Sequence, residues 1–226
     1  ARAALADSGV AADALDEVIL GCVLPAGQGQ APARQAAIAA GIPMNVPATT
    51  VNKMCGSGMK AVMLGADQIR AGNARAILAG GIESMSNSPY LLMEARSGYR
   101  TGHSELIDHM FHDGLQSPWD GQSMGCFADT TAEKYGFTRA DQDNYAALSV
   151  QRAQRAVKEG DFQAEIAPVT VTTRKSENVV ATDETPFGVD IGRIPHLKPA
   201  FDAKGTVTAA SSSSISDGAS VVVIAS

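Results

Sequence analysis

The sequence predicts a layered α/β fold with a mixed, largely parallel central sheet and an additional irregular region. Short apolar strand-like runs alternate with helix-like segments over residues 1–83, which favours parallel strands covered by helices. Residues 84–204 lack this regular alternation. The apolar run 219–225 then closes the chain and is typical of a central strand buried on both faces.

Start and stop signals divide residues 1–83 into helices and strands. Glycine suits the position after a helix because it adopts a left-handed backbone without a Cβ clash, and Gly9, Gly41 and Gly72 end three helical segments on this basis. The longest segment has apolar residues at helical spacing, among them Met59 and Met63, which we expect in the core. The expected elements in chain order are helix 1–8, strand 16–20, helix 32–40, strand 48–52, helix 58–71 and strand 75–78.

Two helices and one strand are expected inside the irregular region. Thr138 followed by Asp141 three residues later fits a capping box, so the second helix begins at this point. Irregular regions of such length are usually functional. The expected elements are helix 127–135, helix 138–159, strand 169–173 and a proline-containing loop at 179–199.

Composition excludes several classes of function. The net charge of −6 argues against binding to nucleic acid, because such proteins usually display a basic stripe. No apolar run approaches the roughly 20 residues that span a bilayer, so we expect no membrane partner and a cytoplasmic location. Cys22, Cys55 and Cys126 are odd in number and at no metal-ligand spacing, so neither a disulfide framework nor a metal site is expected.

Cys55 is the candidate nucleophile. It follows a β-branched stretch and precedes glycines and a helix-like segment. A cysteine in the first turn of a helix feels the partial positive charge of unpaired N–H groups, which favours the thiolate form. Gly56 and Gly58 leave space for a bulky acyl group and its carrier. The alternative is a buried cysteine that packs as a small hydrophobic residue, and the flanking glycines favour the nucleophile.

Four segments of the chain resemble the thiolase family of acyl-CoA C-acyltransferases. The segment 51–60, VNKMCGSGMK, resembles the motif that holds the acylated cysteine of these enzymes, and segments 29–35, 79–92 and 205–218 resemble thiolase segments in the same order. Four ordered matches are far more specific than one short pattern. The resemblance implies acyl transfer through a Cys55 thioester, with the Cys55 backbone N–H in an oxyanion hole. It also implies acyl-CoA and CoA as substrates without a further cofactor, a role in fatty acid metabolism, and a homotetramer or dimer.

The same resemblance assigns contacts with the acyl and pantetheine groups. Many short-chain thiolases have a His-Met-Gly triplet where this chain has Ser123, Met124 and Gly125. Met124 is therefore expected to wall the acyl pocket, while the missing histidine removes the usual cue to acyl-chain length. The other substrate-binding residues that the resemblance implies are Leu115, Leu197, Phe201, Ala209 and Ser213.

The resemblance also divides the chain into parts. It implies an N-terminal thiolase core at 1–83 and 205–226, and a loop domain at 84–204 that covers CoA and contributes to oligomer contacts. Thiolases use a later histidine and a later cysteine as bases, and no segment here resembles those motifs. We therefore expect the C-terminal half to be absent and this chain alone to have negligible turnover. The alternative is a non-catalytic CoA-binding or assembly module with a thiolase fold.

Three weaker patterns suggest other chemistries. Ser57 and Lys60 have the serine-x-x-lysine spacing of penicillin-recognising enzymes, but the partner motifs are missing, so Ser57 is expected in a turn or packing role. Residues 27–29 lack the third glycine of a dinucleotide fingerprint and are expected to form a plain loop. The cluster around His109 and Asp113 follows no metal-site spacing, so it is expected on a solvated surface, although these two residues could share a helix face.

Overall fold

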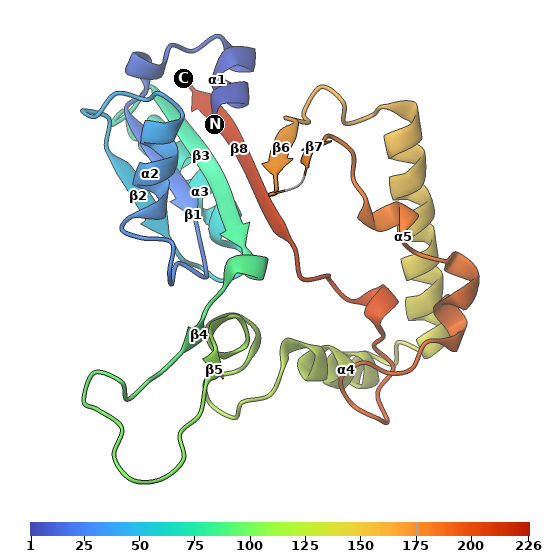
Figure 1. The fold of residues 1–226 in the computed structure, drawn as a ribbon. Coiled ribbons are helices and arrows are strands. Elements are labelled where there is room, and N and C mark those ends of the chain that lie inside the picture. Colours follow the sequence, from blue (N-terminus) through green and yellow to red (C-terminus); the bar gives the residue numbers. More distant parts are fainter. Residues whose placement is uncertain (175) are drawn as a thin grey trace. The chain divides into compact units, whose positions relative to one another are not determined.

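The computed structural model describes residues 1–174 and 176–226, which form two compact units (Figure 1). Unit 1 comprises Ala1–Gly121 and Ile215–Ser226, and unit 2 comprises Gln122–Ser214. The unit boundary therefore differs from the expected division, because residues 84–121 pack with unit 1. The role of 84–204 as a loop domain that covers CoA stays a prediction.

Unit 1 is built on a four-stranded mixed sheet. β1 (Glu17–Gly21) pairs in parallel with both β2 (Ala48–Val51) and β3 (Ala76–Ser84). β8 (Asp217–Ala225) joins from the far end of the sequence and pairs antiparallel with β3, so the strand order is β2-β1-β3-β8. The sheet confirms the predicted α/β class and its largely parallel character.

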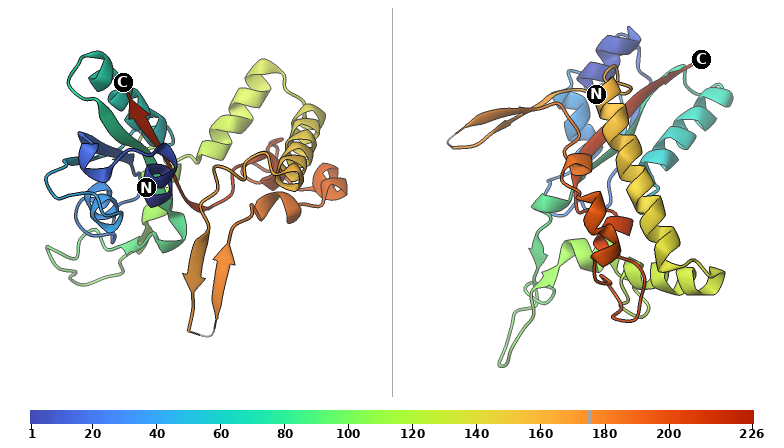
Figure 2. Two further views of the ribbon diagram at one scale, coloured as in Figure 1. Left: turned by 90° about the horizontal axis from the view of Figure 1, so that it is seen from above. Right: turned by 90° about the vertical axis from the view of Figure 1, so that its right-hand side faces the viewer.

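Helices cover both faces of this sheet. α1 (Arg2–Ser8) and α2 (Pro32–Ala39) lie on one face, and α3 (Ser57–Arg70) lies on the other. Because successive strand side chains point to opposite faces, Val18 packs with α1 and α2 while its neighbour Ile19 packs against α3. The right-hand view of Figure 2 shows α3 in teal on the opposite side of the sheet from the blue α1 and α2. The unit therefore has the expected α/β/α layers.

The methionines of α3 do not lie in the core, so that prediction was wrong. Met59 is 71% exposed and Met63 is 51% exposed. The helix instead turns its small residues Ala61 and Gly65 to the sheet, and a Cβ on Gly65 would lie only 3.2 Å from Ile77. Helical spacing identifies an apolar face, but small residues let α3 approach the strands closely on a different face.

Among the described residues, the run 219–225 lies at the edge of the sheet, where a central buried strand was expected. In the part of the chain that the structure describes, β8 pairs with β3 alone, and all 9 of its residues are exposed or half-buried. Val222 is 46% exposed. A continuous apolar run indicates burial on both faces, but the burial itself depends on segments that are distant in the sequence.

A smaller hairpin and a π-helical turn complete unit 1. β4 (Tyr90–Leu91) pairs antiparallel with β5 (Ile107–Asp108), and the π-helical turn covers Met110–Leu115. His109 is only 4% exposed, so this residue departs from the predicted solvated surface, whereas His112 and Asp113 are exposed as predicted. Its Nδ1 lies 2.6 Å from Oδ2 of Asp113, one helical turn away, and this bond satisfies one ring nitrogen inside the protein.

Unit 2 contains two long helices whose boundaries largely match the prediction. α5 (Arg139–Glu159) has the predicted capping box: the Asp141 N–H donates to Oγ1 of Thr138 at 3.1 Å, and the Thr138 N–H donates to Oδ2 of Asp141 at 3.0 Å. The hydrogen bonds from Thr138 lower the pKa of the Asp141 carboxyl. α4 (Met124–Tyr135) begins three residues earlier than predicted. The sequence did not mark this start, because Gly125 in the first turn is a weak helix former.

The remainder of unit 2 consists of short elements. β6 (Val169–Thr172) confirms the predicted strand and pairs antiparallel with β7 (Glu177–Val180). Residues 179–199 were expected to form a loop, but they include the end of β7 and two 3-10 helices. None of the helices in the described part of the chain is both long enough and apolar enough to cross a membrane. The 3-10 helices of the two units are Ala12–Ala14, Met85–Asn87, Thr185–Phe187, Ile191–His196 and Ala209–Ser211.

Candidate active site

Cys55 lies in the turn that joins β2 to α3 in unit 1. α3 begins at Ser57 with Gly56 as its N-cap, so Cys55 lies one residue before the N-cap rather than in the first helical turn. The cysteine is exposed and lines a cleft of about 650 Å³. This exposure favours the candidate nucleophile over a buried packing cysteine.

The cleft lies at the carboxyl ends of β1 and β3, where open α/β sheets commonly bind ligands. Glycines let the start of α3 touch these strand ends. A Cβ on Gly21 would lie 2.5 Å from the backbone carbon of Ser57, and a Cβ on Gly58 would lie 3.4 Å from the nitrogen of Gly81. The amino end of α3 therefore lies directly against the sheet, with Cys55 at the cleft. The lining residues are Gly21, Val23, Met54, Cys55, Ser57, Gly58, Met59, Val62, residues 79–83 and residues 218–222.

Glu83 contributes a carboxylate to the cleft and holds the loop after β1. Its two oxygens accept hydrogen bonds from the Val23 N–H at 2.9 Å and the Leu24 N–H at 3.0 Å. Oε1 of Glu83 also lies 3.7 Å from Sγ of Cys22. Burial, and then the negative charge of Glu83, raise the pKa of the Cys22 thiol. Cys22 is therefore held in its protonated form at neutral pH.

Iodoacetamide at neutral pH is expected to alkylate Cys55 and to leave Cys22 unmodified in the folded protein. Alkylation needs an accessible thiolate, whereas Cys22 is only 2% exposed and its pKa is raised. Peptide mapping by mass spectrometry after a short exposure measures the two modifications. The denatured protein, in which both cysteines react, is the control. Equal labelling of Cys22 and Cys55 before unfolding would contradict the expectation.

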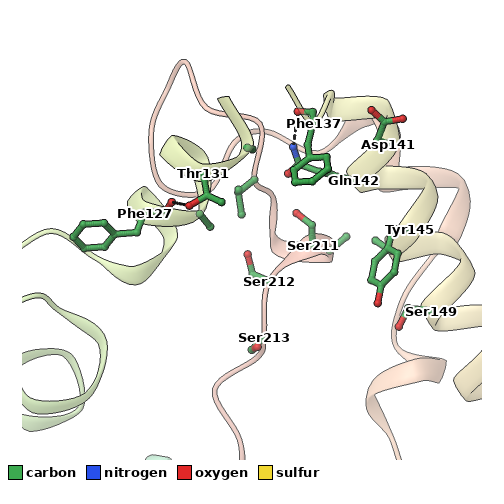
Figure 3. Close-up of a pocket in the computed structure, with 15 residues that line it drawn as sticks. Phe127, Thr131, Phe137, Asp141, Gln142, Tyr145, Ser149, Ser211, Ser212 and Ser213 are labelled. Carbon is green, nitrogen blue, oxygen red and sulfur yellow. Dashed lines mark hydrogen bonds between the residues drawn. The ribbon is translucent and has the colours of Figure 1, made fainter. Parts of the chain in front are cut away.

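Unit 2 contains a groove of about 860 Å³ between α4, α5 and the residues around Ser211 (Figure 3). Tyr145 and Ser149 lie one turn apart on α5 and line one side of the groove. The Ser212 hydroxyl donates to the Thr208 carbonyl at 2.7 Å, so it stabilises its own turn. A mostly apolar groove with a few polar groups is typical of small-molecule sites. The lining residues are Phe127, Ala128, Thr131, Ala132, Phe137, Asp141, Gln142, Tyr145, Ala146, Ser149, Val207 and residues 210–213.

Both long helices of unit 2 hold the segment that leads into this serine-rich turn. Oδ1 of Asp129, on α4, accepts hydrogen bonds from the N–H groups of Thr206 at 2.7 Å and Val207 at 2.8 Å. Nε2 of Gln142, on α5, donates to Oγ1 of Thr206 at 2.8 Å. Sequence reasoning missed both side chains, because a polar residue on a helix usually indicates a solvated face. No local signal marks their contacts with a segment more than 60 residues away.

The predicted substrate-binding residues lie in both units. Leu115 ends the π-helical turn of unit 1, and the other five lie in unit 2. Within unit 2, the Phe201 ring packs on Gly125, next to Met124; a Cβ on Gly125 would lie 2.2 Å from that ring. The structure thus places Phe201 against the sequence neighbour of Met124, and the roles of all six residues stay predictions. Leu197 follows the 3-10 helix Ile191–His196, Ala209 begins the 3-10 helix Ala209–Ser211, and Ser213 lines the groove.

The described residues contain no group of three or more His, Cys, Asp or Glu side chains that could hold a metal ion. Cys22, Cys55 and Cys126 are all free thiols. His109 contacts Asp113 through Nδ1, and its Nε2 is buried without a hydrogen-bond partner among the described residues. Cys55 is therefore the accessible reactive group that the cleft of unit 1 offers.

The fold and this turn define an α/β protein with an exposed thiol at a strand-to-helix junction, an arrangement suited to covalent chemistry. Comparison with known proteins identifies the family. The chain belongs to the thiolase family, since the family model described as "Thiolase, N-terminal domain" matches residues 1–226. The resemblance seen in the sequence is therefore confirmed.

Individual relatives agree with this assignment. The chain is 50% identical over 227 aligned positions to an acetyl-CoA acetyltransferase of Pseudomonas aeruginosa, and 48% identical to one of Cupriavidus necator. Each match covers 100% of this chain and 58% of the relative. The crystal structure of the Acat5 thiolase from Ascaris suum in complex with coenzyme A is similar with a TM-score of 0.92 and 40% identity, over 100% of this chain and 57% of that one. The chain thus spans just over half the length of these relatives.

Proposed function

We propose that the protein containing this chain is an acyl-CoA:acetyl-CoA C-acyltransferase that carries the acyl group on Cys55. The observation that supports it most directly is the exposed Cys55 in a cleft at the strand ends, within a chain that matches the thiolase N-terminal domain throughout. The reaction is the condensation of two acetyl-CoA molecules to acetoacetyl-CoA, or the thiolytic cleavage of a 3-ketoacyl-CoA. The coenzyme A bound to the similar Ascaris suum thiolase supports CoA thioesters as the substrates.

The chemistry begins with attack of the Cys55 thiolate on the thioester carbonyl. The new sulfur–carbon bond forms a tetrahedral intermediate, and the Cys55 backbone N–H is proposed to stabilise its oxyanion. Collapse breaks the bond to CoA, which leaves as a thiolate and takes up a proton. The acyl group then rests on Cys55 as a thioester, so ping-pong kinetics follow.

The second half-reaction needs a base that removes a proton from the incoming acetyl-CoA or CoA. The described cleft offers Glu83, but its carboxylate is already bonded to Val23 and Leu24. We therefore assign this base to the part of the protein that corresponds to the unmatched length of the relatives, and this chain alone is proposed to lack turnover. The full-length protein is proposed to be a cytoplasmic homotetramer or dimer that acts in fatty acid metabolism and uses no further cofactor.

The substrate contacts are proposed from the resemblance to the thiolase family. Leu115, Leu197 and Phe201 would supply apolar contacts to pantetheine, and Met124 would wall the acyl group. Ala209 and Ser213 would line the channel near the sulfur. The exposure of Met124 and Phe201 supports this assignment, because a flexible thioether and an aromatic ring suit an apolar carrier arm.

Treatment of the intact protein with acetyl-CoA is expected to add one acetyl group to Cys55, because the acyl-enzyme is a covalent intermediate. Intact mass spectrometry detects the adduct, and peptide mapping locates it. Cys55→Ala should lose the adduct, whereas Cys126→Ser is the matched control and should keep it. If the unmodified protein forms no adduct, the non-catalytic CoA-binding module becomes the better description.

A further inference from the structure

The turn that carries Cys55 contains an unusual backbone conformation. Met54 has φ of 49°, and among the described residues other than glycine only Ala31 shares a positive φ. An L-residue with a side chain is disfavoured in this region and keeps such a conformation only when its surroundings hold it. The contacts of Met54 therefore indicate what maintains the turn.

The Ser57 hydroxyl crosses this turn. Its Oγ accepts a hydrogen bond from the Lys53 N–H at 2.8 Å and donates one to the Met54 carbonyl at 2.6 Å. Ser57 is only 4% exposed, so water cannot readily replace these bonds. Two backbone bonds also cross the turn, from the Gly56 N–H to the Lys53 carbonyl at 3.1 Å and from the Ser57 N–H to the Met54 carbonyl at 2.9 Å. The hydroxyl thus gives the two residues before Cys55 an additional link to the first residue of α3.

The backbone N–H of Met54 is held by the side chain of Asn52, two residues earlier. Oδ1 of Asn52 accepts a hydrogen bond from the Met54 N–H at 2.9 Å. Ser57 itself packs on the sheet, since a Cβ on Gly21 would lie 2.6 Å from the Ser57 Cβ. The hydroxyl is therefore anchored to the sheet of unit 1, whereas Cys55 lies in the exposed part of the turn.

We propose that Ser57 is a positioning residue for acylation of Cys55. Its hydroxyl keeps Met54 in the positive-φ conformation, so that the Cys55 thiol and the Cys55 N–H face the cleft in one fixed arrangement. Ser57 acts through the backbone of Lys53 and Met54, not on the acyl group. Attack by the thiol and stabilisation of the oxyanion need both groups of Cys55 at once, and this requirement makes acylation sensitive to the turn. The inference rests on the proposed acyl transfer.

Ser57→Ala in the intact protein is expected to slow acetylation of Cys55 by acetyl-CoA on the order of 10- to 100-fold. Alkylation of Cys55 by iodoacetamide should change by less than about threefold, because displacement of iodide needs the thiol but no oxyanion stabilisation. Rapid-quench mass spectrometry measures the first rate and peptide mapping the second. Ser57→Thr restores a hydroxyl and should recover most of the acetylation rate. Ser97→Ala removes an exposed hydroxyl that bonds, among the described residues, to the Glu94 carbonyl, and should leave both rates unchanged.

The outcomes separate this inference from the proposed function. Failure of the unmodified protein to become acetylated would overturn the acyl transfer itself. Normal acetylation of the unmodified protein together with an unchanged rate in Ser57→Ala would overturn the role of Ser57 alone. Equal loss of acetylation and alkylation would also overturn it, because a general loss of structure explains that result. Where Ser57→Ala does not fold, Ser57→Gly removes the same hydroxyl and the contact with Gly21, and the same comparison applies.

Discussion

Cys55→Ala in the intact protein is expected to lower kcat for thiolysis of acetoacetyl-CoA on the order of 10⁴-fold or more, as the loss of a covalent nucleophile does in other enzymes. The cleft offers no replacement, because Cys55 has the only thiol among its described lining residues. Ser57, the nearest hydroxyl in sequence among the lining residues, already bonds to Lys53 and Met54. The covalent route would therefore be closed.

Steady-state kinetics with CoA and acetoacetyl-CoA measure this loss. Cys55→Ser is expected to lose nearly as much activity, because a serine hydroxyl without a neighbouring base is a weak nucleophile. Cys126→Ser should keep the activity of the unmodified protein. The thermal midpoint should barely change in Cys55→Ala, since the cysteine is exposed. A kcat within tenfold of the unmodified value would mean that the acyl group is carried elsewhere.

Gly80→Ala is expected to lower the free energy of unfolding by about 3 kcal/mol or more, at the upper end of overpacking effects. Gly80 lies in β3, and a Cβ there would lie 2.1 Å from the Ser220 carbonyl oxygen and 2.7 Å from the Val221 Cα. Both are backbone atoms of β8, so the methyl group fits only if the ladder between β3 and β8 opens. Because Gly80 also lines the cleft, the distortion should reach the site of Cys55.

Gly218→Ala is the matched control for this prediction. Gly218 lies in the same ladder, but a Cβ there would meet nothing within 4 Å. Its effect on the free energy of unfolding should stay within about 0.5 kcal/mol. Urea denaturation of the two variants and the unmodified protein makes the comparison. Equal stability of Gly80→Ala and Gly218→Ala would show that the ladder yields to the extra methyl group at little cost.

Local signals predicted much of the fold. The capping box of Thr138 and Asp141 begins α5 in the structure, because both hydrogen bonds lie within one turn of helix. Gly9, Gly41 and Gly72 follow their helices with positive φ, as glycine at a helix end does. These features depend only on residues a few positions apart, so the sequence contains all the information they need.

Burial was harder to predict. Met59 and Met63 have a helical spacing that suits a core, yet α3 turns Ala61 and Gly65 to the sheet. The run 219–225 has the composition of a buried strand, yet it forms an edge. In both cases the exposed surface depends on which distant segments pack there, and one short sequence pattern fits several arrangements.

The sequence by itself determined the resemblance to the family, the order of the main helices and strands, and Cys55 as the candidate nucleophile. Motifs and local hydrogen-bonding residues define these properties, and both can be read along the chain. Only the tertiary structure decided that Cys55 is exposed at a cleft, that the Ser57 hydroxyl braces its turn, and that Asp129 and Gln142 hold the serine-rich turn. The physical reason is that accessibility and long-range hydrogen bonds arise from close packing between segments far apart in sequence, such as Gly21 against Ser57 and β8 against β3.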